Sequence, residues 1–206
     1  CQVSTSGILR FCQVLGYKGY KDFRFDMLHY LHQEHVEVNS ENLFDELTSK
    51  YLSVIRQFNN IDQNKLNQLI KQIKNTKNIY IIGVHYSSLP AKHLVLGLQD
   101  LGINTYFAYD YMQASHLYNT IHEDDLLIYF SIEGNQNNVS RFFNLTNASK
   151  NTYIITLNPK PKLLIENTLI LPGYTLSKQS IVDLQSIVVI FVELLLNMFH
   201  NTLKED

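Results

Sequence analysis

The stretch "NIYIIGVHYSSLPAKHL", residues 78–94, places a short apolar run, a glycine-containing turn and the start of a helix next to one another. The run at 78–83 is rich in Ile and Tyr, which is typical of a buried strand. Pro90 is well placed in the first turn of a helix that we expect to begin near Leu89. The stretch therefore predicts one strand–turn–helix unit of an α/β domain.

Further apolar runs follow the same design and are separated by segments of helical length. They are "NTYFA" (104–108), "DLLIYFS" (125–131), "NTYIITL" (151–157) and "NTLILP" (167–172). Strands that alternate with helices form a parallel sheet that is covered on both faces. We therefore predict a parallel sheet whose ligands bind beyond the carboxyl ends of the strands, at the turns after Gly83 and Ser131.

Both turns carry groups that suit an anion. The first contains Ser87 and Ser88, and the second, "SIEGNQNNV", contains Gly134 ahead of a helix expected from near Gln136. Hydroxyls and free backbone N–H groups at two helix N-termini make a reasonable phosphate site. Ordinary helix capping by Ser and Asn explains the same residues equally well.

The segment before the sheet is predicted to be helical. Residues 4–15 have Ser4 or Thr5 as N-cap, an apolar face of Ile8, Leu9, Phe11, Cys12 and Leu15, and Gly16 as the terminating glycine. A second helix is expected from about Tyr20 to His32 or His35. This pair fits the second half of a helix-turn-helix module, although any small helical hairpin gives the same pattern. Residues 40–75 are again helical, with a break near 59–62 and Asp62 as a cap.

Composition bounds the class of protein. The chain has 206 residues, 45% of them apolar, and a formal net charge of −2, which suits one sizeable core or one domain with a small satellite. Residues 1–30 hold four basic residues against two acidic ones, so this end alone suits a polyanion, unless its charges are simply solvated.

Cysteine usage and hydropathy point to the cytoplasm. Two cysteines make no disulfide framework, and we expect no membrane span, because the apolar run at 186–199 is interrupted by Glu193 and Asn197. His29, His32 and His35 have helical spacing but no evident fourth ligand, so we expect no metal and no cofactor. The chain begins with Cys in the middle of a motif and is therefore expected to be a fragment.

The stretch "VSTSGILRFCQVLGYKGYKDF" resembles the end of the helix-turn-helix domain of RpiR/MurR-type bacterial transcription regulators. The positions in register are Val3, Ser4, Ile8, Arg10, Phe11, Leu15, Gly16, Tyr17, Gly19, Tyr20 and Phe23, whereas Gly7 departs from the pattern. The rest of the chain is similar to the sugar isomerase (SIS) domain that follows in these regulators. The resemblance implies a partial DNA-binding domain at 1–38, connecting helices at 39–75 and an SIS domain at 76–206.

The resemblance also implies a flavodoxin-like, five-stranded sheet that binds a phosphorylated sugar, or a relative such as an N-acetylmuramic acid phosphate, and so alters DNA affinity. The family's Gly-x-Gly-x-Ser loop falls on Gly83, His85 and Ser87, and its Ser-x-Ser-Gly-x-Thr loop falls on Ser131, Glu133, Gly134 and Gln136. The candidate effector site is therefore Gly83, His85, Ser87, Ser88, Ser131, Glu133, Gly134, Asn135 and Gln136.

Three of these residues depart from the family's loops: His85 replaces a glycine, and Glu133 and Gln136 replace hydroxyl residues. A carboxylate about 4 Å from a phosphate costs on the order of 4 kcal/mol at an effective dielectric near 20. Glu133 either turns outward and leaves Ser87, Ser88, Asn135 and the helix N-termini to hold phosphate, or fills the anion site itself, or selects a cationic or uncharged polyol ligand. His85 either donates to phosphate, pairs with Glu133 or simply fills space.

The candidate DNA contacts lie at the N-terminal end. Ser4, Thr5 and Ser6 stand at the start of the recognition helix, and Arg10, Lys18 and Lys21 are expected to contact the DNA backbone, although Arg10 has the alternative of pairing with an acidic residue in its own domain. The partners are then operator DNA and a small effector. Helix-turn-helix proteins bind paired half-sites, and the apolar stripes at 180–199 and 66–73 exceed what one small sheet needs, so we expect a homodimer or a tetramer.

A sugar-phosphate isomerase of the same fold is the competing class. Isomerases need an acid and a base near the sugar carbons, and no convincing pair stands out in the sequence. The helix-turn-helix prefix favours a regulator, and we therefore do not expect an enzyme.

Overall fold

The computed structural model describes residues 5–24, 27, 42–134, 151–161, 165–180 and 184–204 of the chain. The chain divides into two compact units, residues 1–48 and 49–206, and each is described by itself. The predicted domain limits at 38 and 75 stay predictions.

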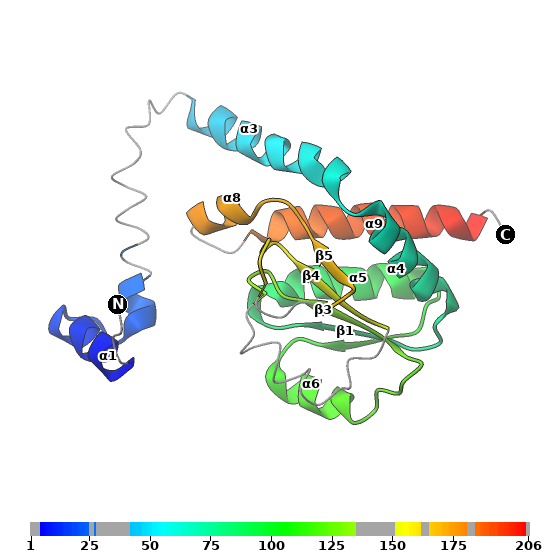
Figure 1. Cartoon of the computed structure of the whole chain (residues 1–206), viewed down its shortest axis with the longest axis horizontal. Coiled ribbons are helices and arrows are strands. Elements are labelled where there is room, and N and C mark those ends of the chain that lie inside the picture. Colours follow the sequence, from blue (N-terminus) through cyan, green and yellow to red (C-terminus); the bar gives the residue numbers. More distant parts are fainter. Residues whose placement is uncertain are drawn as a thin grey trace. The chain divides into compact units, whose positions relative to one another are not determined.

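The second unit is built on a five-stranded parallel sheet with the strand order β2-β1-β3-β4-β5 (Figure 1). The strands are β1 (Ile79–Gly83), β2 (Thr105–Ala108), β3 (Leu126–Phe130), β4 (Thr152–Thr156) and β5 (Thr168–Ile170). Each lies within one of the five apolar runs, so the predicted α/β class and the parallel sheet are confirmed. The order reverses between β1 and β3, where an open α/β sheet places its ligand crevice.

Helices cover both faces of the sheet. On one face α4 (Gln63–Asn75), α5 (Ser88–Asp100) and α9 (Gln185–Lys204) share a core with alternate strand residues such as Ile79 and Ile81. On the other face lies α6 (Tyr111–Tyr118) (Figure 1). It shares a second core with Tyr80 and Ile82, the strand residues that alternate with Ile79 and Ile81. Buried parallel strands have apolar residues on both sides, which is why these runs show no polar alternation.

The helical segment before β1 breaks where the sequence predicts. Helix α3 (Leu43–Arg56) continues into a 3-10 turn η1 (Gln57–Asn60), and α4 then begins after Asp62. The Asp62 carboxylate accepts hydrogen bonds from the backbone N–H groups of Asn64 and Lys65, at 3.0 and 3.2 Å. The predicted N-cap is therefore confirmed, and it satisfies donors that the helix leaves free.

Helix α9 packs as a core helix. By length and composition this helix could cross a membrane, but core helices of soluble proteins meet the same criteria. In the structure it buries one side against the core and contacts α5 and α4. Its buried residues are Ile187, Val188, Phe191, Val192, Leu195 and Phe199. The stripe at 66–73 is buried in the same core. The 66–73 stripe therefore does not supply the spare surface on which the predicted homodimer partly rested, whereas α9 keeps exposed apolar side chains such as Leu194. The homodimer stays a prediction.

In the first unit, α1 (Thr5–Val14) ends as predicted at Gly16, whose φ of 88° is in the left-handed region. The N–H groups of Gly16 and Tyr17 donate to the carbonyls of Gln13 and Cys12, which is the Schellman arrangement. Phe23 contacts Phe11 and Tyr17 edge-on, with ring centroids 5.6 and 5.4 Å apart.

The predicted apolar face of α1 is buried only at Cys12 within the described residues. The other members, Ile8, Leu9, Phe11 and Leu15, are exposed. The second helix is described over Tyr20–Arg24, and its predicted continuation lies largely outside the described residues.

Replacing Asp62 with Ala should lower the free energy of unfolding by about 1 kcal/mol, because the N-terminal donors of α4 lose their acceptor. Urea denaturation followed by circular dichroism measures this change. Asp62→Asn is the matched control, since Asn also caps helices and should retain most of the stability. Equal losses for both variants would show that the cap is not what Asp62 contributes.

Candidate functional site

The turns after β1 and β3 lie side by side because these strands are paired, with Gly83 opposite Phe130. Between them is a small cavity of about 100 Å³, called here the cradle cavity. It is lined by Val84, His85, Tyr86, Ser87, Tyr111, Tyr129, Phe130, Ser131, Ile132 and Glu133. Four of the predicted effector residues, His85, Ser87, Ser131 and Glu133, are therefore brought together at one cavity.

The first loop packs tightly on Gly83. It consists of a short 3-10 turn η2 (His85–Ser87) that leads directly into α5. A Cβ atom at position 83 would overlap the Ser87 carbonyl and lie 2.8 Å from the Ala91 Cβ, so only glycine fits there. The Ser88 hydroxyl donates to the His85 carbonyl at 2.6 Å. Of the two predicted serines, Ser87 therefore faces the cavity, whereas Ser88 hydrogen-bonds to the loop's own backbone.

His85 keeps the backbone conformation of a glycine. Its φ of 55° lies in the left-handed region, which is sparsely occupied by other residues but several-fold enriched in His, Asn and Asp. Its ring meets Tyr111 edge-on, with centroids 6.0 Å apart. A residue with this φ is compatible with a position that is glycine in the family's loop, and the imidazole is part of the cavity wall.

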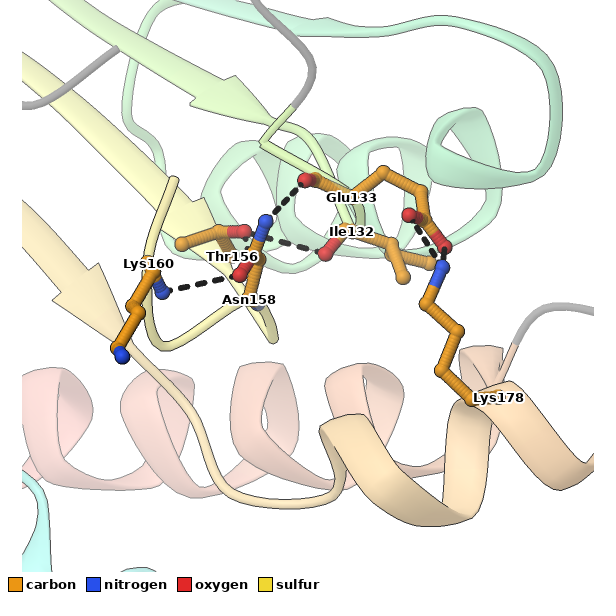
Figure 2. A network of polar contacts seen from close by, with 6 residues as sticks. All are labelled: Ile132, Glu133, Thr156, Asn158, Lys160 and Lys178. Atoms are coloured by element: carbon orange, nitrogen blue, oxygen red, sulfur yellow. Dashed lines mark hydrogen bonds and ion pairs between the residues drawn. The ribbon is translucent and has the colours of Figure 1, made fainter. Parts of the chain in front are cut away.

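The second loop, residues 131–134, is anchored by the end of β4 (Figure 2). The Thr156 hydroxyl donates to the Ile132 carbonyl at 3.1 Å, and the Asn158 amide donates to the Glu133 carbonyl at 2.8 Å. The other end of that amide accepts from the Lys160 backbone N–H at 2.9 Å, so Asn158 itself is oriented. These contacts satisfy two buried or half-buried carbonyls and fix the course of the loop.

Gly134 ends the anchored part of this loop. It has a φ of 56°, and a Cβ atom there would lie 2.6 Å from the Pro161 Cβ. The position therefore requires glycine on both conformational and steric grounds. Asn135 and Gln136, the remaining predicted effector residues, lie outside the described residues.

The carboxylate of Glu133 is paired with a lysine that the sequence analysis did not single out. Lys178, on α8 (Tyr174–Gln179), places its Nζ 2.6 Å from both carboxylate oxygens (Figure 2). The same ammonium lies over the ring of Tyr174, 5.1 Å from its centroid. Both partners of the ion pair are 39% exposed, so the pair adds no more than about 1 kcal/mol to stability. Its main effect is to neutralise the charge that Glu133 brings to the loop.

Tyr129 presents a neutral hydroxyl to the cradle cavity. Burial, and after it the neighbouring Tyr111, raises the pKa of Tyr129 well above its usual range. With Tyr86 and Tyr111 it makes part of the cavity lining aromatic.

A larger cavity of about 540 Å³ also borders α8. Its walls come from α3, η1, the residues after β4 and β5, and α8; they include Val54, Gln57, Leu157, Gly173, Tyr174 and Gln179. Only one charged residue, Lys50, is among its lining residues. The predicted residues meet at the smaller cavity, whose volume is below the roughly 300–1,000 Å³ of typical ligand pockets. The cradle cavity therefore accommodates a group the size of a phosphate rather than an entire sugar phosphate.

The predicted DNA-contacting residues are on the first unit. Thr5, Ser6, Arg10, Lys18 and Lys21 are exposed, and Ser4 lies outside the described residues. No group of three metal-ligating side chains occurs among the described residues, and His29, His32 and His35 are not among them.

The strand order 2-1-3-4-5 and the paired loops at the carboxyl ends of β1 and β3 define an open α/β domain of the flavodoxin-like order. Comparison with known proteins adds a match at the other end of the chain. Residues 1–34 match the helix-turn-helix domain of the rpiR family, so a domain of that family stands at the N-terminus.

One similar protein is an uncharacterized HTH-type transcriptional regulator in the aarA 3' region of Providencia stuartii. It is 24% identical over 84% of this chain, and the chain spans 65% of that relative's length.

Solved structures share the fold. NanR of Vibrio vulnificus, complexed with ManNAc-6P, has a TM-score of 0.68 at 20% identity, over 99% of this chain and 77% of that chain. The sugar isomerase domain of an RpiR transcription factor from Sphaerobacter thermophilus has a TM-score of 0.60 at 16% identity. The match covers 80% of this chain and 93% of that chain. Other neighbours of this fold are described as putative sugar-phosphate isomerases.

Replacing Asn158 with Asp should loosen the 131–134 loop, because the side chain loses the amide donor to Glu133 but keeps its size and its acceptor. Leaving the Glu133 carbonyl unpaired should cost about 1–2 kcal/mol. Hydrogen exchange should then be faster at the Gly134 amide, which donates to the Ser131 carbonyl. Exchange at the amides of α4 is the internal reference, and unchanged protection of Gly134 would remove Asn158 from this role.

Proposed function

We propose that the chain is a DNA-binding transcription regulator of carbohydrate metabolism whose second unit binds a phosphorylated sugar. One observation carries the proposal: an rpiR-type helix-turn-helix domain precedes, in the same chain, an α/β unit whose β1 and β3 loops meet around one cavity. A regulator of this kind needs a site for DNA and a site for an effector, and the chain offers a candidate for each.

The cradle cavity has the groups that a phosphate needs. Ser87 and Ser131 supply hydroxyls, and α5 begins directly after Ser87, so its positive dipole end lies beside the cavity. NanR, which has the same fold, is complexed with ManNAc-6P, a sugar phosphate. The sugar of such an effector is larger than the cavity and extends out through its opening.

The ion pair removes the main objection to phosphate. An unpaired Glu133 carboxylate would repel a phosphate strongly in this setting. With Lys178 at 2.6 Å the two side chains are together neutral, so neither a self-filled anion site nor a cationic ligand is required. We therefore favour a phosphorylated effector over the other two alternatives for Glu133.

Isomerase activity is the weaker alternative. Its acid and base would have to come from the cavity, where Glu133 is paired with Lys178 and the His85 ring packs against Tyr111. A regulatory role uses all parts of the chain, including the helix-turn-helix domain.

We further propose that the protein binds paired operator half-sites as a homodimer or tetramer.

Hexose and amino-sugar phosphates, with ManNAc-6P first, should raise the unfolding temperature saturably at sub-millimolar concentration, because they bind only the folded protein. Ser131→Ala and Ser87→Ala should each weaken this binding roughly tenfold through loss of a charge-assisted hydrogen bond. Ser88→Ala is the control, since that hydroxyl donates to His85 rather than facing the cavity. Failure of every sugar phosphate to stabilise the protein would contradict the proposal.

Replacing Lys18 and Lys21 together with Ala should weaken binding to a random-sequence duplex and lower the slope of log K against log salt by roughly 2, because two phosphate contacts are lost. Fluorescence anisotropy between 50 and 200 mM salt measures the slope. Lys71→Ala with Lys77→Ala removes the same charge from exposed positions of the second unit and should leave the slope unchanged. An unchanged slope in the first variant would exclude these lysines from the interface.

A further inference from the structure

We propose that Lys178 belongs to the effector site and exchanges partners there: it holds the Glu133 carboxylate in the unoccupied protein and the phosphate of the effector in the occupied one. The inference rests on the proposed function, because it specifies how the same cavity recognises a phosphomonoester.

The charges around the cradle cavity support this role. Among the residues that line it, Glu133 is the only carboxylate, and the lining residues include no lysine or arginine. The Lys178 ammonium lies 2.6 Å from both Glu133 oxygens, so it contacts a residue that lines the cavity (Figure 2). An ammonium attracts a phosphate dianion more strongly than a carboxylate monoanion. A phosphate that enters the cavity therefore competes with Glu133 for Lys178.

The pair is built so that it can exchange. Both side chains are 39% exposed, and an ion pair that remains in contact with water is weak, so breaking it costs little. Lysine carries its charge as a point on a flexible stem, and it can change partner without the fixed two-point geometry of arginine. The Tyr174 ring, 5.1 Å from the ammonium, keeps the cation close to the loop once Glu133 releases it.

Helix α8 would follow such an exchange. The helix begins after Gly173, which has a φ of 109° and packs against Val54 of α3. Tyr174, Leu176 and Gln179 face the cavity of about 540 Å³ that α8 shares with α3, so space for a small displacement is present on that side. The occupancy of the cradle cavity thereby changes the packing on residues 49–56 of α3.

The experiment measures binding of inorganic phosphate and of ManNAc-6P by isothermal titration calorimetry. Glu133→Gln should tighten binding roughly tenfold, because it removes the carboxylate that both competes for Lys178 and repels the phosphate. Lys178→Met should weaken binding by a similar factor. Lys160→Met removes a lysine charge close to the same loop and should bind like the unaltered protein. Hydrogen exchange at residues 174–179 should change on phosphate binding in the unaltered protein and not in Lys178→Met.

The decisive comparison is Lys178→Met in the Glu133→Gln background. A lysine that only neutralises Glu133 has nothing to neutralise there, so the second substitution would be silent and the exchange overturned. Direct contact with phosphate predicts instead a loss of roughly tenfold in that background. Thermal unfolding verifies that each variant is folded, and Lys178→Gln replaces any Met variant that is not.

The failures of the two proposals are distinguishable. No heat from either probe, with the unaltered protein and with Glu133→Gln alike, would remove the phosphate site and this proposal with it. Binding that is saturable in the unaltered protein but insensitive to Lys178 in both backgrounds would leave the proposed function in place and overturn only the exchange.

Discussion

Parallel pairing of β1 with β3 is the constraint on which the site depends. Adjacent parallel strands end at the same edge of a sheet, so the loops after Gly83 and Phe130 must meet there. Glycine at 83 lets the first loop pack against its own strand, and the loop, with its left-handed backbone at His85, contributes Ser87 to the cavity lining. The cradle is thus a consequence of strand order, of the close packing that a glycine at 83 permits, and of the left-handed backbone at His85.

Tertiary contacts from the second half of the unit complete the cradle. Thr156 and Asn158, at the end of β4, hold the carbonyls of Ile132 and Glu133, while Lys178 on α8 holds the Glu133 carboxylate (Figure 2). The backbone and the side chain of one residue are therefore controlled by two different elements. The shape of the loop is therefore maintained by hydrogen bonds from the end of β4, whereas its net charge is set by a half-exposed ion pair.

Local patterns in the sequence were reliable guides to the elements. The five apolar runs, the Asp62 cap and the Gly16 terminus all depend on residues within a few positions of one another, and the structure has each of them. The interpretation of the 66–73 stripe as spare surface was wrong, because its burial depends on packing against α9 and the sheet. The resemblance placed His85, Ser87, Ser131 and Glu133 in one site, but it could not say what partner a carboxylate there would find.

The sequence by itself determined the fold class, the identity of the loops and the presence of a charge in the cradle, because strand runs, glycines and caps act through short-range sterics and hydrogen bonding. Only the tertiary structure decided the environment of that charge. Asn158 and Lys178 lie 25 and 45 residues beyond Glu133, and no periodicity or spacing relates residues so far apart. They meet because the sheet aligns β3 with β4 and the chain returns through α8, so Glu133 is a neutralised wall residue rather than an isolated carboxylate.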